Sequence, residues 1–516
     1  MKGLGSRAYN ILFHTHTVSG IVISVVLFVI FFAGAISLYK KEMYQWEDPA
    51  ARIPVVNNID YERLILRLDS IKSGAKEADE LTVKLPSIER PIYTVYVPIA
   101  SSAGTYYATF IYNPVTDHIT ELFNGDGTTT GETLYRLHFL DQVSWYIGRY
   151  IAGFVSLFFA FAIITGLLIH WKNIVSKFYA FSFKQVKKQF STNAHTVFGI
   201  IGLPFQLMYA ITGAFYMLSI LVLAPAVVTL FKGDQQELVK RIYPPEAFHK
   251  HDENTKQANH VPIGQGLQKI RNDYPEYEVS YLEIINLGKK QAALSADLVN
   301  SKSFNQDGTV VLDLVSEKYK LEIKPGEKNY AQSILQGISK VHFGSFGGWL
   351  LKAIYFILSI FTCFVIISGV LIWKEARNKP TYTDRQRSFH HRVTMLYLSI
   401  CFSLFPATAL LFNAEQLVPT VSGHANKVNT IFFLGWLMFA AVGCFLKTEK
   451  NMIRYCLFLG GTLACIVPLS NGLGTGDWFW KSLANHPYVF MVDMVWLITG
   501  VFSLALTFMM RKKVSN

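Results

Sequence analysis

Long apolar runs alternate with polar segments along the whole chain, and they determine its predicted architecture. Each run holds roughly 18 to 25 residues, the length that crosses the hydrocarbon core of a bilayer as a helix. We therefore expect a polytopic α-helical membrane protein with about eight transmembrane helices. The runs lie near residues 17–39, 146–171, 195–231, 345–373, 393–412, 429–446, 455–469 and 488–510.

Two polar segments, residues 40–140 and 232–341, are long enough to fold outside the membrane. In both, helical periodicity is followed by alternating apolar and polar positions, which is typical of strands. We expect each segment to form a small α+β module on the outer face. The first has a helix over 61–71 and strands at 81–85, 92–98, 106–112 and 119–122; the second has a helix over 264–272 and strands at 277–285, 291–298, 310–315 and 319–323.

The order helix, outer module, helix occurs twice, and short motifs mark corresponding positions in an internal duplication. Repeats in the same orientation are related by an axis along the membrane normal. The paired motifs are His16-Thr17-Val18-Ser19-Gly20 with His195-Thr196-Val197-Phe198-Gly199, Leu137-His138-Phe139 with Val341-His342-Phe343, and Ile164-Thr165-Gly166 with Ile367-Ser368-Gly369. The chain then divides into a first repeat (1–171), a cytoplasmic loop (172–194), a second repeat (195–373), a basic cytoplasmic loop (374–392) and a four-helix extension (393–516).

Composition agrees with a membrane location and explains the basic net charge. The chain is 51% hydrophobic and 16% charged, whereas soluble domains carry about a quarter charged residues. The net charge is +12, but its Lys and Arg gather in the loops expected inside. The two short outer loops hold only Lys427 and Lys481. The positive-inside rule therefore predicts cytoplasmic N- and C-termini, and the charge indicates no nucleic-acid partner.

The cysteines and the loops limit the available chemistry. All five cysteines lie in apolar runs and no Cys-x-x-Cys-His sequence is present, so covalent haem attachment is excluded. The cytoplasmic loops hold at most about twenty residues, too few for a flavin or nicotinamide domain, and no Gly-rich dinucleotide motif follows a predicted strand. The absence of such a domain limits the possible mechanism of a redox reaction.

Four histidines occupy equivalent positions in the two repeats. His16 and His195 lie at the inner membrane boundary, and His138 and His342 lie on the outer side. A single histidine at such a boundary is usually an interfacial residue, but a pseudo-twofold axis would bring these four together as two pairs. Imidazole is a common axial ligand of haem iron. The pattern favours a cofactor at each face.

Glycines and basic residues accompany these histidines. Gly20 and Gly199 each follow a histidine by four residues and therefore share its helical face; they would either let a flat macrocycle approach or allow close helix packing. Arg149 and Lys352 near the outer boundary would either pair with haem propionates or extend to lipid phosphates.

Other ionisable residues offer alternatives. His170 ends the second span, where Trp373 occupies the matching position of the second repeat, and His390 and His391 open the fifth span, where they could replace an inner ligand. Asp493 in the last span is a candidate proton site or a partner in a helix-packing hydrogen bond. His249, His251 and His260 lie in a polar outer linker. This linker is either a solvated loop or a metal site.

Together these motifs resemble the PepSY-associated transmembrane family. The resemblance rests on His-x-x-x-Gly at the start of an apolar helix, an outer α+β module, Leu-His-Phe, and Thr-Gly-Leu-Leu-Ile-His-Trp, and it covers roughly residues 8–378. It implies a bacterial inner-membrane protein of the iron-regulated or ferric-siderophore reductase type, with periplasmic PepSY-like modules. By position, the family's haem-binding histidines correspond to His16, His138, His195 and His342. Thr17 and Thr196 stand where a basic residue often follows the first histidine.

These expectations combine into one hypothesis. Two noncovalent haem b groups, the inner between His16 and His195 and the outer between His138 and His342, would pass electrons from an unknown donor to a ferric siderophore or similar chelate in the periplasm. The alternatives are a non-redox binding or transport protein, a regulatory membrane anchor, and a copper or other metal site that uses the same imidazoles.

Overall fold

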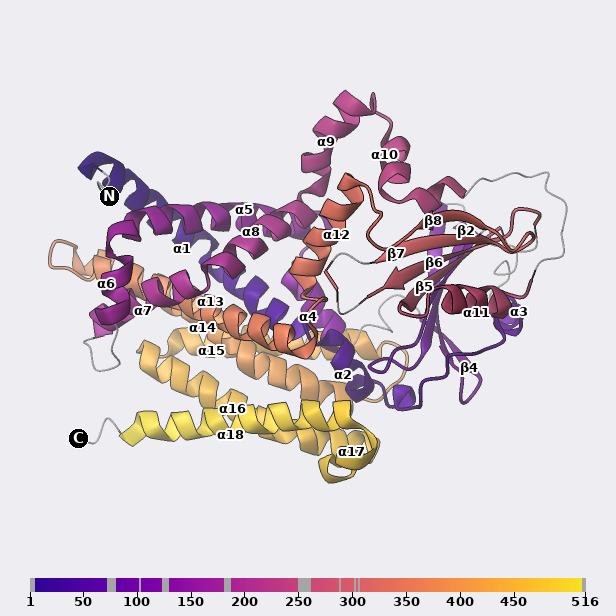
Figure 1. Ribbon diagram of the computed structural model, residues 1–516. Helices are drawn as coiled ribbons and strands as arrows, with labels where there is room; N and C mark the ends of the chain where they lie inside the picture. Colours follow the sequence, from indigo (N-terminus) through magenta and orange to yellow (C-terminus); the bar gives the residue numbers. More distant parts are fainter. Residues whose placement is uncertain are drawn as a thin grey trace. The chain divides into compact units, whose positions relative to one another are not determined.

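The computed structural model divides the chain into two compact units (Figure 1). One unit comprises Met1–Glu47, Thr128–Val222 and Lys352–Asn516, and the other comprises Asp48–Gly127 and Leu223–Leu351. The structure describes residues 5–71, 80–101, 104–122, 130–180, 187–248, 261–286, 289–300, 303–304 and 307–512.

The first unit is helical and contains the membrane-spanning helices of both repeats. The two long helices of the first repeat, α1 and α5, pack on each other, and α5 also packs on α8 of the second repeat. Its helices from the repeats are α1 (Ser6–Ser37), α2 (Lys40–Glu47), α4 (Thr130–His138), α5 (Trp145–His170), η2 (Trp171–Asn173), α6 (Ile174–Ala180), α7 (Lys187–Ile201), α8 (Leu203–Met217) and most of α13 (Gly348–Arg377). Between α8 and α10, α9 (Ser219–Leu230) leads out of this unit.

The C-terminal extension forms a helical bundle in the same unit. In it α14 packs on α15 and α16, and α16 packs on α18. Thr383 and Gln386 begin α14 with a reciprocal capping box, which satisfies two otherwise free backbone N–H groups. The helices are α14 (Asp384–Leu417), α15 (His424–Phe445), α16 (Glu449–Thr475), α17 (Phe479–Asn485) and α18 (Pro487–Lys512).

The number of membrane spans agrees with the expectation from the sequence. Within the described residues, seven helices are long and apolar enough to cross a bilayer, and an eighth span results if the bent pair α7–α8 counts as one. The two halves of that pair meet at 68°. The bend follows from Pro204 at the start of α8, which lacks the N–H needed to continue the helix. The apolar run 195–231 is therefore three helical pieces instead of one straight span.

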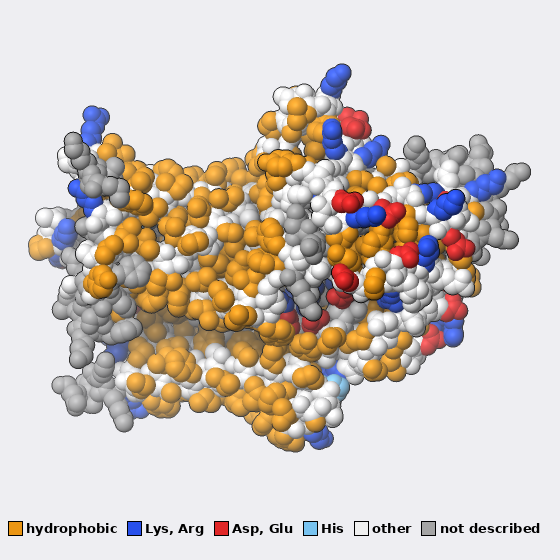
Figure 2. Space-filling view, viewed as in Figure 1, with side chains coloured by type: hydrophobic (Ala, Val, Ile, Leu, Met, Phe, Trp, Pro, Cys, Tyr) orange, Lys and Arg blue, Asp and Glu red, His pale blue; other side chains and the backbone are white. Residues whose placement is uncertain are grey.

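The surface of the helical unit is suited to lipid. Figure 2 shows a broad band of hydrophobic side chains over this unit, with Lys and Arg gathered at the end that carries both chain termini. On α5, large apolar side chains exposed at helical spacing include Ile147, Ile151, Phe154, Phe158 and Phe161. An uncharged exposed surface of this width is what the bilayer interior requires. The protein is thus a multi-pass membrane protein.

The second unit is built on one antiparallel sheet, in the order β4-β3-β2-β1-β5-β6-β7-β8. The first strands of the two modules pair at its centre, with Leu81 opposite Ile284 and Val83 opposite Leu282. This pairing removes two exposed strand edges. The two modules that we expected from the sequence therefore share one sheet. The strands are β1 (Glu80–Lys84), β2 (Tyr93–Ser101), β3 (Gly104–Asn113), β4 (His118–Leu122), β5 (Glu278–Ile285), β6 (Ala293–Val299), β7 (Gly308–Asp313) and β8 (Tyr319–Ile323).

The predicted helices α3 (Tyr61–Ile71) and α11 (Ile263–Asp273) share one hydrophobic core with the sheet. Leu64 and Leu68 of α3 and Leu267 and Ile270 of α11 are buried in it. Both helices are amphipathic, so one side of each is covered by the strands while the other stays polar. The remaining elements of this unit are η1 (Pro49–Ala51), α10 (Gln235–Ile242), η3 (Pro244–Phe248) and α12 (Tyr330–Phe343).

Candidate functional site

His16 of α1 and His195 of α7 lie next to each other in the helical unit. Their ring centroids are 6.3 Å apart and the ring planes meet at 75°. The two residues stand at equivalent positions of the duplicated halves, so the structure brings together the inner pair that the repeat suggested.

Each of these rings is held by the helix of its own repeat. The Nδ1 of His16 lies 2.9 Å from the carbonyl oxygen of Ala162 on α5, and the Nδ1 of His195 lies 2.9 Å from that of Val365 on α13. Because a carbonyl oxygen can only accept, Nδ1 carries the proton in both rings. The lone pair is therefore on Nε2, the tautomer that a metal-binding histidine needs.

Small residues on the same two helices complete the arrangement. A Cβ added at Gly166 would meet Cε1 of His16 at 3.0 Å, and one added at Gly369 would meet Cε1 of His195 at 3.2 Å. The neighbouring Ser368 hydroxyl lies 3.1 Å from Nδ1 of His195, and the equivalent Thr165 hydroxyl lies 3.5 Å from Nδ1 of His16. The Thr-Gly and Ser-Gly pairs, which in the sequence only mark the repeat, thus position the two imidazoles.

The spacing of this pair would allow both imidazoles to hold one iron atom. A ligating nitrogen lies about 2 Å from its metal, so two imidazoles on one atom would have their ring centres about 6 Å apart. The observed separation is 6.3 Å. A Cβ added at Gly20 or Gly199 would meet open space. Neither glycine is therefore a close packing contact with another described residue, and a role toward a macrocycle stays a prediction.

His138, at the end of α4, is held in the same way, by a backbone carbonyl and a nearby glycine of a neighbouring helix. Its Nδ1 lies 2.8 Å from the carbonyl oxygen of Ile30 on α1, and a Cβ at Gly34 would come within 2.6 Å of that nitrogen. Burial lowers the pKa of His138, so the ring stays neutral near pH 7. The chain turns between α4 and α5 at Leu140, whose φ is +62°. This turn explains why His138 precedes its apolar run by several residues.

His342 lies on α12 of the other unit, where its ring packs edge-on against Phe343 with centroids 5.3 Å apart. The Gly344 that follows caps α12 in the left-handed conformation, with φ +61°. The outer pair of His138 and His342 stays a prediction.

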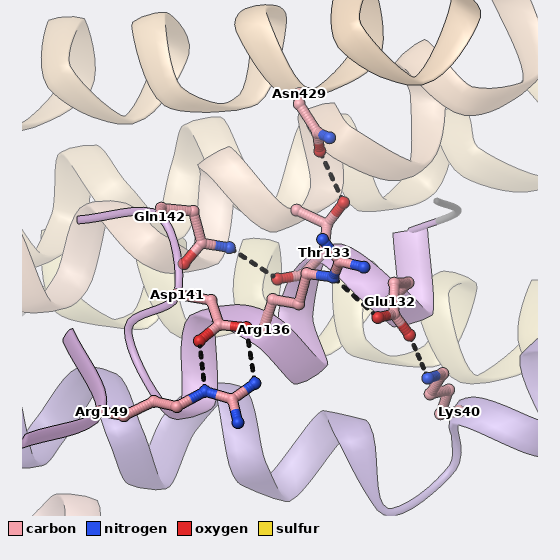
Figure 3. A network of polar contacts seen from close by, with 8 residues as sticks. All are labelled: Lys40, Glu132, Thr133, Arg136, Asp141, Gln142, Arg149 and Asn429. Atoms are coloured by element: carbon pink, nitrogen blue, oxygen red, sulfur yellow. Dashed lines mark hydrogen bonds and ion pairs between the residues drawn. The ribbon is translucent and has the colours of Figure 1, made fainter. Parts of the chain in front are cut away.

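The two basic residues expected near haem propionates have carboxylate partners in the chain. Arg149 donates from Nε and Nη2 to Asp141, at 2.8 and 3.1 Å (Figure 3). Its guanidinium also lies over the ring of Phe139. The ammonium of Lys352 pairs with Glu42, which is only 1% exposed. A role of either residue toward a propionate therefore stays a prediction, and it would require sharing or exchange of these partners.

Polar contacts of α4 connect it with α1–α2 and with the C-terminal extension. Figure 3 shows Glu132 between Lys40 and Arg136, and the Thr133 hydroxyl donating to Oδ1 of Asn429 on α15 at 2.5 Å. Thr130 also donates to Glu415 of α14 at 3.1 Å. The extension thus holds the short helix that ends in His138.

We expect the Glu132 contacts to make stability depend on pH. Burial alone would raise the pKa of Glu132, but Lys40 and Arg136 outweigh it and hold the pKa below the usual 4.5. Such a carboxylate stabilises the fold above its unfolded-state pKa and loses this effect as the pH falls through the folded value. The thermal midpoint of purified protein should decrease on acidification, and Glu132→Gln should flatten this decrease. Asp384→Asn is the control, because the Asp384 carboxylate is 95% exposed. If Glu132→Gln shows the same dependence of the thermal midpoint on pH as the unmodified protein, the prediction is contradicted.

Asp493 of α18 takes part in buried hydrogen bonds. It is fully buried and accepts from Trp46 Nε1 at 2.8 Å and from Asn471 Nδ2 at 2.9 Å. Gln416 donates to the backbone oxygen of Trp46 at 2.7 Å. The carboxylate therefore takes part in a helix-packing hydrogen-bond network that joins the extension to α2, while a role as a proton site stays a prediction.

The other candidate histidines have different surroundings. His170 ends α5, His390 packs edge-on against Trp373 with centroids 5.1 Å apart, and Nδ1 of His391 lies 3.6 Å from Glu449. Trp373 is the repeat equivalent of His170. No group of three or more His, Cys, Asp or Glu side chains suited to a bare metal ion occurs within the described residues. The linker histidines His249, His251 and His260 lie outside those residues.

Comparison with known families agrees with this arrangement. A family model described as the PepSY-associated TM region matches residues 13–376. The chain belongs to the PepSY-associated TM family. The match begins just before His16 and ends within α13, so it includes all four paired histidines, and α14 to α18 lie beyond it. No curated protein matches the chain significantly.

Proposed function

We propose that this protein is a haem-containing reductase of the bacterial inner membrane that delivers electrons to periplasmic ferric iron. The observation that carries the proposal is the His16–His195 pair, with centroids 6.3 Å apart and both Nδ1 atoms hydrogen-bonded to backbone carbonyls. The proposed topology places the N- and C-termini in the cytoplasm and the sheet unit in the periplasm.

Two noncovalent haem b groups are proposed, each able to take up and give one electron when bound. His16 and His195 would hold the inner group, and His138 and His342 the outer. In His16, His195 and His138, the hydrogen bond from Nδ1 to a backbone carbonyl makes Nε2 more basic and fixes the ring orientation. Gly166 and Gly369 keep the two inner imidazoles from being displaced.

The proposed substrate is ferric iron in an oxygen-rich chelate such as a siderophore. One electron converts ferric to ferrous iron, and the lower charge weakens its attraction to hard anionic oxygen ligands. The electron donor would act from the membrane or the cytoplasm, because the inner loops are too short for a flavin domain.

A non-redox binding, transport or regulatory protein is the second candidate. The cavity of about 270 Å³ in the sheet unit favours it, because polar side chains from several elements line this cavity. This function would leave purified protein colourless, whereas the reductase requires haem.

An assay in sealed lipid vesicles tests the reductase function. We expect vesicles containing the protein and an internal reductant to reduce an external ferric chelate, detected with a ferrous-specific dye, well above empty vesicles. His16→Ala should abolish the difference. His14→Ala is the matched control, because His14 is exposed on the same helix. Equal rates for His16→Ala and unmodified protein would contradict the proposal.

A further inference from the structure

The second unit contains a cavity of about 270 Å³ near one end of its sheet. Its walls come from β6, β7 and β8, from the segment after α10, and from the N-terminal half of α12. The polar side chains that line it include Tyr243, Asp297, Asp307, Lys328, Gln332 and Gln336.

The amide of Gln336 is buried beside this cavity without a partner. Neither its nitrogen nor its oxygen makes a hydrogen bond to another described residue. Gln332, one turn earlier on α12, is different: its Oε1 accepts from the Asn329 N–H at 3.0 Å and its Nε2 donates to Ile242 at 3.4 Å. Buried amides are nearly always paired, so Gln336 points to a ligand that is able both to donate and to accept.

The charged groups of the cavity are also incompletely paired. Asp307 is paired with Lys340, whose Nζ lies 2.9 Å from both carboxylate oxygens. Lys328, by contrast, makes no ion pair with any described residue, although Asp297 and Asp307 act on it electrostatically. Asp297 accepts from the Thr309 hydroxyl at 3.1 Å through Oδ1 only. Burial lowers the pKa of Lys328 and raises that of Asp297, as expected for two charges that lack close partners.

The incompletely paired side chains indicate the chemistry of a ligand that would fit this cavity. Lys328 requires an anionic group, Asp297 a cationic donor, and Gln336 a donor and an acceptor. A simple anion would leave Asp297 unmatched, and a metal cation would be repelled by Lys328. One water fills about 30 Å³ of liquid, so the cavity has room for a molecule of roughly ten non-hydrogen atoms.

We propose that this cavity binds a free α-amino acid as its zwitterion, with the carboxylate on Lys328, the ammonium on Asp297 and the amide of Gln336 between them. Every residue that forms this site lies in the sheet unit, and none of them is a proposed haem ligand. It would give the sheet unit a sensing or recognition role of its own.

Thermal unfolding and calorimetric titration of the purified full-length protein test this proposal. Each of the twenty common amino acids is added singly, and at least one should raise the unfolding midpoint and bind with a measurable Kd. Its methyl ester and its N-acetyl derivative, which each lack one charge, should not bind. Lys328→Met and Asp297→Asn should each weaken binding about thirtyfold or more.

Gln336→Leu provides the control that separates ligand binding from folding. Without ligand this variant should be at least as stable as the unmodified protein, because it removes an unpaired buried amide, and it should still bind the amino acid more weakly. Haem content should be unchanged in all three variants. The proposal is overturned if none of the amino acids binds, if the charge-blocked derivatives bind equally well, or if Gln336→Leu leaves the affinity unchanged.

Discussion

Replacing His16 or His195 with alanine is expected to remove the inner haem, which is about half of the total, and to stop transmembrane electron delivery. Each substitution deletes one of the two axial nitrogens, and one imidazole alone holds a noncovalent haem less firmly. The measurement is the haem-to-protein ratio of purified variants together with the reduced-minus-oxidised absorption spectrum.

The control for this experiment is His14→Ala, on the exposed side of the same helix, which should keep the full haem content. A second check is that both histidine variants keep the unfolding behaviour of the sheet unit. Full haem content in His16→Ala and in His195→Ala would exclude these residues as ligands.

Gly20→Leu and Gly199→Leu are expected to lose the inner haem while leaving the polypeptide folded. A Cβ at either position meets no described atom within 4 Å, so we expect the added side chain to leave the protein's own packing intact. It does occupy the space beside His16 or His195 that a macrocycle requires. Haem content and thermal unfolding, measured on the same samples, separate the two effects.

Gly166→Leu gives a useful contrast, because a Cβ there already meets His16 at 3.0 Å. It should displace the imidazole whether or not haem is bound. If Gly20→Leu and Gly199→Leu retain haem at the unmodified level, the open space beside these glycines is not the cofactor site.

The structure indicates a role for the C-terminal extension that its sequence did not suggest. Asp493 binds Trp46 at the end of α2, and Asn429 binds Thr133 of α4. Both contacts stabilise short helices of the helical unit, α2, which follows the C-terminal end of α1, and α4, which carries His138. The extension therefore supports the part of the helical unit on which the proposed outer site depends.

The sequence was sufficient to predict the features that depend on periodicity and repetition. Apolar runs of bilayer length located the spans, and the spacing of His16 and His195 within equivalent motifs located the inner pair. Thr165 and Gly166 were visible in the sequence as markers of the repeat. Their contact with His16 depends on how two helices pack, which a single sequence does not encode locally.

Features that depend on distant contacts were not predictable. The pairing of β1 with β5 joins strands about two hundred residues apart, and no local pattern distinguishes a free edge from a paired one. The partners of Lys352 and Arg149, Glu42 and Asp141, are likewise set by packing. The bend at Gly202 had a local signal in Pro204, which a long apolar run concealed.

The most direct test of the central claim is the absorption spectrum of the purified protein, expressed with haem supplied, before and after dithionite. We expect a b-type spectrum whose Soret band shifts and whose α band sharpens on reduction, with two haems per chain and one lost in His16→Ala. A protein without a Soret band would contradict it.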